Sequence, residues 1–316
     1  MLRGIRSGFM LAALAAGVAA PALAQELPQE GPVPTTALIN VESKNPVQID
    51  ARGLTLQVNG HDTPITSLRA ASSGNEEIAI LIDDGLRTNF GLQLKEISTF
   101  VNSLPRNAGV LVGYMENGTV KSSGHFTADH QELANQIRVP LGVPGQSASP
   151  YFCLSDLVKH WPSQEPAARF VLMITNGVDP YNGSTSMMNQ DSPYVQTAQD
   201  DAVRAGVAVY SIYFQDSGFR GGRGSFSGQS YLQQVGDATG GMLFNNGTIT
   251  PVSIMPYLNQ FERAINSSYE LGFRANAQNK RDALVRIKVK SNLSGVKVRA
   301  PEAVRPGLTE ETIATR

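Results

Sequence analysis

A run of five consecutive apolar residues, Ile78 to Ile82, constrains the fold of this chain more than any other feature of its sequence. The run is too short for a helix and too continuous for a strand with one face in water, so it predicts a strand buried on both faces. Such strands belong to parallel sheets that are covered by helices. Two acids, Asp83 and Asp84, follow the run directly. In open α/β sheets ligands bind just beyond the carboxyl ends of the strands, so this is the first position to search for a site.

The segment that follows alternates between helical and strand patterns. Further buried strands are expected at 108–115, 170–174 and 207–214, with a polar edge strand at 119–127 and helical patterns between the buried ones. Strands separated by helices imply right-handed crossover connections. The predicted fold class is therefore α/β, with a mainly parallel central sheet covered by helices on both faces.

The two flanks of this segment have a different pattern. Short stretches of period-two alternation lie at 37–68 and 269–299, without helical patterns between them. We expect the two flanks to pair with each other, so that the α/β unit is inserted in a small β-rich accessory unit. The predicted organisation is a signal peptide (1–24), a linker (25–36), a β-rich flank (37–72), the α/β domain (73–268), a second β-rich flank (269–303) and a tail (304–316).

The first 24 residues have the pattern of a secretory signal. Arg3 and Arg6 precede an apolar run from Phe9 to Ala20, and Ala22 and Ala24 supply small residues for cleavage. The apolar run is shorter than the ~20 residues that a membrane span requires. We therefore predict a periplasmic or secreted location. Cleavage removes two of the 26 basic residues and none of the 27 acidic ones, and this acidic balance argues against a nucleic-acid partner.

Few side chains offer a basis for catalysis. Cys153 is the only cysteine, which excludes an intrachain disulfide, and its apolar neighbours predict a buried, inert thiol. The four histidines show no metal-ligand spacing. The sequence has no Gly-x-Ser-x-Gly elbow, P-loop or dinucleotide fingerprint, so we predict that the protein is not an enzyme.

The stretch IAILIDDG and the later strand FVLMITNGVD together resemble the von Willebrand factor A domain, particularly the bacterial exported proteins related to it. The resemblance covers residues 76–268, and those relatives also tend to have β-rich flanks. In that family, a metal-ion-dependent adhesion site combines an Asp-x-Ser-x-Ser loop after the first strand with a threonine from another loop. An aspartate in a Thr-Asp-Gly turn after the fourth strand completes it. Together they surround a divalent cation that takes about six oxygens, some of them from water and the partner.

Position by position, this chain keeps little of that set. Asp83 matches the first aspartate, but Gly85 and Arg87 stand where the serines are expected. Asn176 stands in place of the later aspartate, and no threonine in the loop before the 152–161 helix matches, where Ser147 and Ser149 are weak substitutes. The resemblance therefore implies a degenerate site, and we predict that the protein uses no metal cofactor.

Arg87 adds a permanent positive charge at this position. At ~4 Å and an effective dielectric constant near 20, each unit of like charge opposes a bound cation by about 4 kcal/mol. In one interpretation, Arg87 pairs with Asp83 or Asp84 in place of a metal. Two further interpretations remain open. The carboxylates bind Mg²⁺, Mn²⁺ or Ca²⁺ in a rearranged geometry, for which the residual candidates are Asp83, Asp84 and Asp179; or Asp84 and Asp179 cap the loop or helix that follows.

The sequence favours an exported, non-enzymatic module that binds a protein partner, of unknown identity, through loops at the carboxyl edge of the sheet. The rim of this surface is predicted at 181–192 and 216–228. Two other functions remain open, a divalent-cation-dependent adhesion module with a noncanonical site and a structural scaffold or assembly subunit. The predicted partner-binding residues are Asp83, Asp84, Arg87, Asn176 and Asp179.

Overall fold

The structure, a computed structural model, describes a defined part of the chain: residues 31–44, 47, 49–86, 88–142, 149–182, 191–215, 223–245, 247, 250–276 and 283–308. The predicted signal peptide, Arg87 and much of both predicted rim loops lie outside these residues. Within them, no helix is both long enough and apolar enough to cross a membrane.

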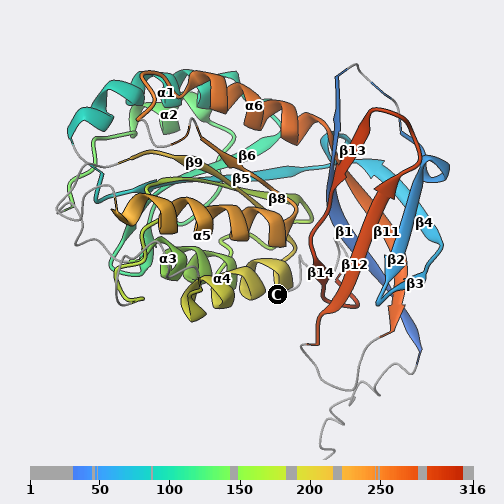
Figure 1. Ribbon diagram of the computed structural model, residues 1–316. Coiled ribbons are helices and arrows are strands. Elements are labelled where there is room, and N and C mark those ends of the chain that lie inside the picture. The colour runs from blue at the N-terminus through green and yellow to red at the C-terminus, as the bar shows by residue number, and fades with distance from the viewer. Residues whose placement is uncertain are drawn as a thin grey trace, which may run out of the picture. The chain divides into compact units, whose positions relative to one another are not determined.

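Strand β5 (Glu76–Asp83) lies in the middle of a six-stranded sheet in the described part of the chain, with the order β10-β9-β8-β5-β6-β7 (Figure 1). All eight residues of β5 are buried, as the apolar run predicts. The pairings are parallel except for that of β6 with β7, which is antiparallel. The other strands are β6 (Ala108–Glu116), β7 (Thr119–Lys121), β8 (Ala168–Thr175), β9 (Val207–Tyr213) and β10 (Leu243–Phe244).

Helices cover both faces of this sheet (Figure 1). Side chains alternate along β5, so that Ile78, Ile80 and Ile82 pack into one apolar core while Ala79 and Leu81 pack into the other. The predicted α/β class is confirmed. One face carries α1 (Leu94–Ser103), α2 (His130–Asn135) and α6 (Met255–Asn266), with the 3₁₀ helix η3 (Thr88–Gln93) before α1; the other carries α3 (Pro150–Lys159), α4 (Pro193–Arg204) and α5 (Arg223–Thr239).

The flanks form two antiparallel sheets of four strands each among the described residues, with the orders β13-β1-β11-β4 and β14-β12-β2-β3. In the first sheet Ala37 pairs with Leu271, and in the second Leu56 pairs with Val289. The expected pairing between the two flanks is therefore present. The strands are β1 (Pro32–Ser43), β2 (Leu54–Val58), β3 (His61–Asp62), β4 (Ile65–Ala70), β11 (Ser268–Asn276), β12 (Val285–Ser291), β13 (Val296–Arg299) and β14 (Ala303–Val304), with 3₁₀ turns η1 (Ala51–Gly53) and η2 (Ala71–Ser73).

Ordered structure extends beyond the predicted flanks at both ends. β1 begins at Pro32, inside the predicted linker, because Val33 and Thr35 are buried while Pro32 and Pro34 point outward. Proline lacks a backbone N–H and is tolerated at a strand edge, so the two prolines do not prevent the strand. They occupy its exposed positions and make its period-two pattern difficult to recognise in the sequence. At the other end, β14 and the buried Leu308 occupy part of the predicted tail.

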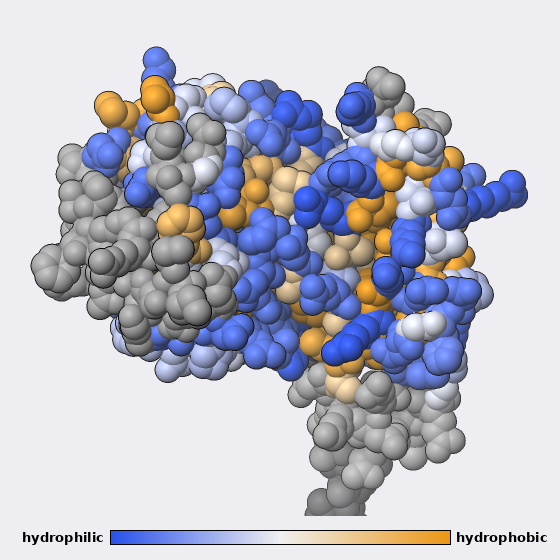
Figure 2. Space-filling view, viewed as in Figure 1, coloured by the Kyte–Doolittle hydropathy of each residue, from blue (hydrophilic) through white to orange (hydrophobic). Residues whose placement is uncertain are grey.

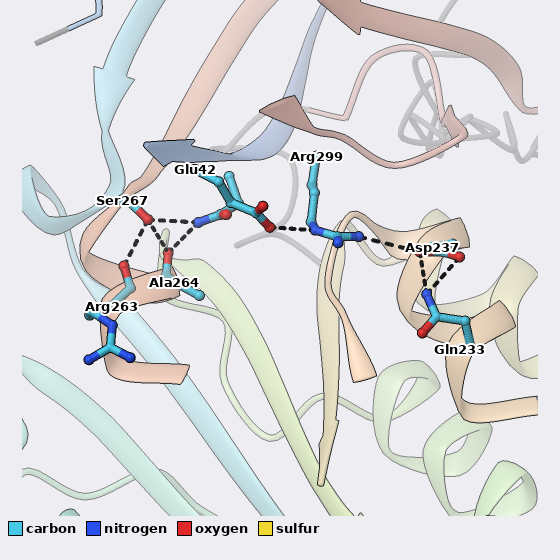
Figure 3. A network of polar contacts seen from close by, with 8 residues as sticks. Glu42, Gln233, Asp237, Arg263, Ala264, Ser267 and Arg299 are labelled. Atoms are coloured by element: carbon cyan, nitrogen blue, oxygen red, sulfur yellow. Dashed lines mark hydrogen bonds and ion pairs between the residues drawn. The ribbon is translucent and has the colours of Figure 1, made fainter. Parts of the chain in front are cut away.

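A polar network joins the accessory unit to the helices of the α/β unit (Figure 3). The buried Asn40 of β1 donates a hydrogen bond from Nδ2 to the carbonyl oxygen of Ala264 in α6 at 2.6 Å. Arg299 of β13 contacts Glu42 at 2.5 Å and Asp237 of α5 at 3.4 Å. These contacts fix the accessory strands against the last two helices of the α/β unit.

Candidate functional site at the carboxyl edge of the central sheet

The ends of β5 and β8 bring Asp83 next to the turn that contains Asn176. Thr175 Oγ1 donates a hydrogen bond of 2.6 Å to Asp83 Oδ2, and the Gly85 amide donates one of 2.9 Å to Asp83 Oδ1. Asp83 is buried, and so is Thr175. Each oxygen of the carboxylate therefore has a donor from inside the protein.

Asp84 is held by an arginine that the sequence did not single out. Only 2% of Asp84 is exposed, and its Oδ1 accepts hydrogen bonds from Arg138 Nη1 at 2.8 Å and from the Leu141 amide at 3.1 Å. The Arg138 guanidinium lies 3.8 Å from the centre of the Tyr114 ring, a cation–π contact that fixes its position. The predicted partner, Arg87, lies outside the described residues, so its pairing stays a prediction.

The polar side chains of the turn after β8 accept hydrogen bonds from the turn itself and from the start of α4. Asn176 Oδ1 accepts a hydrogen bond from the Val178 amide at 2.9 Å. The buried Asp179 accepts one from the Tyr181 amide at 3.1 Å and one from the Ser192 hydroxyl at 3.0 Å, and Ser192 is the N-cap residue of α4. Asp179 thus has the loop-capping role that was one of the interpretations from the sequence.

The described residues at this edge do not fit a divalent cation of the adhesion-site kind. Gly85 offers no hydroxyl, Asn176 offers an amide in place of a carboxylate, and Asp84 faces a guanidinium. Mg²⁺ demands a near-octahedral set of oxygens, whereas both oxygens of Asp83 and the Asn176 Oδ1 already accept hydrogen bonds from within the protein. Nor does the described part of the chain contain a group of three or more His, Cys, Asp or Glu side chains arranged to hold a metal ion.

Exposed apolar side chains gather at the same edge. In the described ranges, eight large hydrophobic residues are exposed, and seven of them lie on segments at the carboxyl ends of the central strands. Figure 2 shows apolar surface protruding at its upper left, the end of the α/β unit near the start of α1. The eighth residue, Leu293, belongs to the accessory unit. The seven are Leu92, Val139, Leu141, Tyr181, Tyr194, Phe226 and Val252.

Four of these residues form an aliphatic group, defined as Leu92, Val139, Leu141 and Val252. Leu92 and Val252 lie on segments joined by a hydrogen bond of 3.1 Å from Gln93 Nε2 to the Val252 carbonyl. A methyl group added at Gly91 would lie 3.3 Å from the Val139 side chain, so Val139 packs beside the same segment. Leu141 is 71% exposed and lies two residues after Val139 in the sequence. Its amide donates a hydrogen bond to Asp84, which fixes its position.

An aromatic group lies over the opposite face of the sheet and consists of Phe152, Tyr181 and Tyr194. The Phe152 ring centre is 5.3 Å from that of Tyr181 and 4.9 Å from that of Tyr194. Tyr181 is 57% exposed and belongs to the first predicted rim loop, as Phe226 belongs to the second. Phe226 lies in α5 and not in a loop as the predicted 216–228 rim implied, and Phe152 and Tyr194 also lie at the starts of helices. Isolated apolar residues carry no periodic signal, so the sequence did not bring these side chains together.

Cys153 is fully buried beneath this edge, as predicted. Burial raises the pKa of its thiol to about 12, and the negative charge of Asp83 adds to the increase. Since only the thiolate is nucleophilic, Cys153 offers no reactive group at neutral pH.

No family model matches this sequence, and no curated protein matches it. Several solved structures resemble it at low sequence identity. An aerotolerance-related membrane protein from Bacteroides fragilis is 14% identical, with a TM-score of 0.42, over 61% of this chain and 99% of the other. The pilus adhesin SpaC from Lactobacillus rhamnosus GG is 10% identical, with a TM-score of 0.43, over 84% of this chain and 47% of the other. The manganese-loaded TRAP protein from Plasmodium vivax is 12% identical, with a TM-score of 0.40, over 80% of this chain and 97% of the other.

These structural neighbours are von Willebrand A-domain proteins. Of the three, SpaC is described as an adhesin.

Proposed function

We propose that this protein is an exported, non-enzymatic module that binds another protein through the carboxyl edge of its central sheet, without a metal ion. The observation that carries the proposal is the concentration of exposed apolar side chains at this edge, seven of the eight in the described ranges. Grouped apolar side chains exposed on a soluble protein mark interaction sites more often than scattered ones do. Tyrosine and phenylalanine are also enriched at protein interfaces.

The buried carboxylates have a positioning role in this proposal. Asp83, Asp84 and Asp179 accept hydrogen bonds from neighbouring segments and so fix the loops that carry the apolar residues. The aliphatic group and the aromatic group then contact the partner. Asn176, which directly follows β8, and Arg87 are the other two residues of the predicted set.

Metal independence is supported by the charge that already faces Asp84. Arg138 places a permanent cation 2.8 Å from the carboxylate, where it neutralises the charge that a metal ion would otherwise offset. A divalent cation at the same carboxylate would have to displace this guanidinium or lie close to it, and either change is unfavourable.

The location and the partner class rest on the sequence. The signal-like pattern in residues 1–24 supports a periplasmic or secreted location, and the degenerate adhesion motif supports a protein as the partner. We propose no nucleic-acid partner, and no membrane insertion after the signal is removed.

Site-specific photo-cross-linking in the cell envelope tests this function. A photoreactive residue at position 141 is expected to form a discrete adduct with another protein, and the adduct should persist with a metal chelator present. Position 293 is the matched control, because Leu293 is also an exposed leucine, at 41%, but lies on the accessory unit.

The same experiment separates the two other functions. An adduct at position 141 that forms only with divalent cations present would contradict metal independence and favour a cation-dependent adhesion module. Adducts only between copies of this chain, or equal adducts at both positions, would contradict the proposed surface and favour a scaffold or assembly subunit.

A further inference from the structure

A cleft of about 650 Å³ lies at the opposite, amino end of the central sheet. It lies where α3 and α4 end and β8 begins, and the segment after β14 contributes to its wall. We name it the basic cleft and define it by Lys159, Trp161, Arg169, Asp201, Arg204 and Arg305. Its volume is within the range of ~300–1,000 Å³ that is usual for small-molecule sites.

Positive charge dominates this cleft. Among the described residues that line it, four are Lys or Arg and one, Asp201, is acidic. Asp201 pairs with Lys159 at 2.8 Å and with Arg204 at 3.6 Å, and Arg204 also pairs at 3.8 Å with Asp200, which does not line the cleft. Lys159 and Arg204 also lie in the last turns of helices, where a cation is favourable by itself. That explanation does not extend to Arg169, which is on a strand, or to Arg305, which follows one.

Arg169 is only 6% exposed, and its Nη2 donates a hydrogen bond of 3.3 Å to the carbonyl oxygen of Ser163. Its Nε lies 3.6 Å from Glu77 Oε2, which is an ion pair but too long for a hydrogen bond, and the Trp161 indole N–H donates to that same oxygen at 2.5 Å. Burial lowers the pKa of Arg169 to about 10, although Glu77 opposes the shift. Within the described residues, no acceptor is bonded to the buried Nε of Arg169 or to that of Arg204.

Both Nε atoms are shielded from the cleft by the protein itself, so a molecule in the cleft would contact the terminal nitrogens of these guanidinium groups. An oxyanion offers several acceptor oxygens and a negative charge, and guanidinium groups bind oxyanions more strongly than they bind neutral acceptors. Trp161 adds an aromatic face to the same wall, with the Arg169 guanidinium 5.2 Å from its ring centre.

We propose that the basic cleft binds a small organic anion, whose oxyanion group accepts hydrogen bonds from Arg169 and Arg204 and whose apolar body lies against Trp161. This site is independent of the protein-binding function at the other end of the sheet. Carboxylates and phosphates both carry negative charge and several acceptor oxygens, and titration with each class distinguishes them.

Trp161 is the single tryptophan of the chain, so tryptophan fluorescence reports directly on this cleft. The titrants are phenyl phosphate, benzoate and inorganic phosphate, each at constant ionic strength set with chloride. We expect a saturable fluorescence change with phenyl phosphate or benzoate, with a Kd below ~1 mM. Whichever binds more tightly identifies the oxyanion.

Arg204→Gln should weaken this binding about tenfold or more, as the loss of a charged hydrogen bond does. Arg263→Gln is the matched control, because it removes the same charge from a helix, α6, that does not line the basic cleft. Lys159→Gln supplies a second variant of the cleft, and circular dichroism checks that each variant is folded.

Three results would overturn the proposal. The first is no saturable change with any of the three titrants. The second is equal weakening by Arg204→Gln and Arg263→Gln, which would indicate nonspecific charge effects. The third is inorganic phosphate binding as tightly as phenyl phosphate, which would remove the apolar body from the ligand.

Discussion

The two ends of the central sheet differ in whether their buried charged groups have hydrogen-bond partners. At the carboxyl edge, Asp83, Asp84 and Asp179 all have hydrogen-bond donors within 3.1 Å, and seven large apolar side chains of the described residues are exposed there. At the amino end, the Nε of Arg169 lacks an acceptor, and Oε1 of the buried Glu76 lacks a donor among the described residues.

This difference shows that charge at a sheet edge does not by itself mark a binding site. In the proposed function, acids that are satisfied internally fix the loops, and the apolar residues on those loops contact the partner. Buried polar groups without hydrogen-bond partners lower the stability of the folded state unless a ligand supplies those partners. The two ends are therefore expected to respond differently to substitution.

The largest effect is expected at the amino end, from Arg169→Met. Glu77 would remain buried with Trp161 as its described donor, and an uncompensated buried charge costs about 3 kcal/mol or more. Urea denaturation should show this loss in the free energy of unfolding. The double variant Glu77→Gln/Arg169→Met should recover much of it, because both charges are then gone. A loss in the single variant of less than ~1 kcal/mol would show that the pair is not effectively buried.

A smaller effect is expected at the carboxyl edge, from Asp84→Asn. The amide keeps one acceptor oxygen but removes the charge that Arg138 faces, so the free energy of unfolding should fall by about 2 kcal/mol. Arg138 is 36% exposed, and solvent limits the effect. Asp156→Asn is the control, since Asp156 is a partly exposed acid that contacts His160 on the surface. Equal changes in the two variants would contradict a structural role for Asp84.

The smallest effect has the opposite sign and comes from Glu76→Gln at the amino end. Burial raises the pKa of Glu76, so the folded state binds its proton more tightly than the unfolded state does. Stability from this group is therefore present below the ordinary pKa of 4.5 and is lost as pH rises through the higher pKa of the folded state. Glu76→Gln should stabilise the protein by about 1 kcal/mol near pH 7 and by almost nothing near pH 4. Thermal unfolding at both pH values measures the difference, and a loss of stability at pH 7 would contradict it.

The sequence predicted the architecture because its signals are local. The apolar run at 78–82 and the period-two flanks each determine how a short segment is buried, and both predictions are confirmed. The polar edge strand is shorter than predicted, since β7 ends at Lys121 and only an isolated bridge joins Thr127 to Val110.

Contacts between residues that are far apart in the sequence cannot be predicted from such local signals. Arg138 is 54 residues away from Asp84, and no spacing rule links them. The basic cleft likewise combines Arg169, Arg204 and Arg305, which share no motif. Each site forms because the crossover connections bring segments that are distant in the sequence together, one site at each end of the sheet. Of the predicted site residues, Arg87 lies outside the described part of the chain, so its role stays a prediction.

Calorimetric titration of the mature chain, residues 25–316, with Mn²⁺, Mg²⁺ and Ca²⁺ tests most directly the proposal that the carboxyl edge works without a metal ion. If Arg138 and the internal hydrogen bonds satisfy the acids, none of the three ions should give a saturable heat. Binding of any of them more tightly than ~100 µM, abolished by Asp83→Ala, would place a cation at this edge and contradict the proposed function.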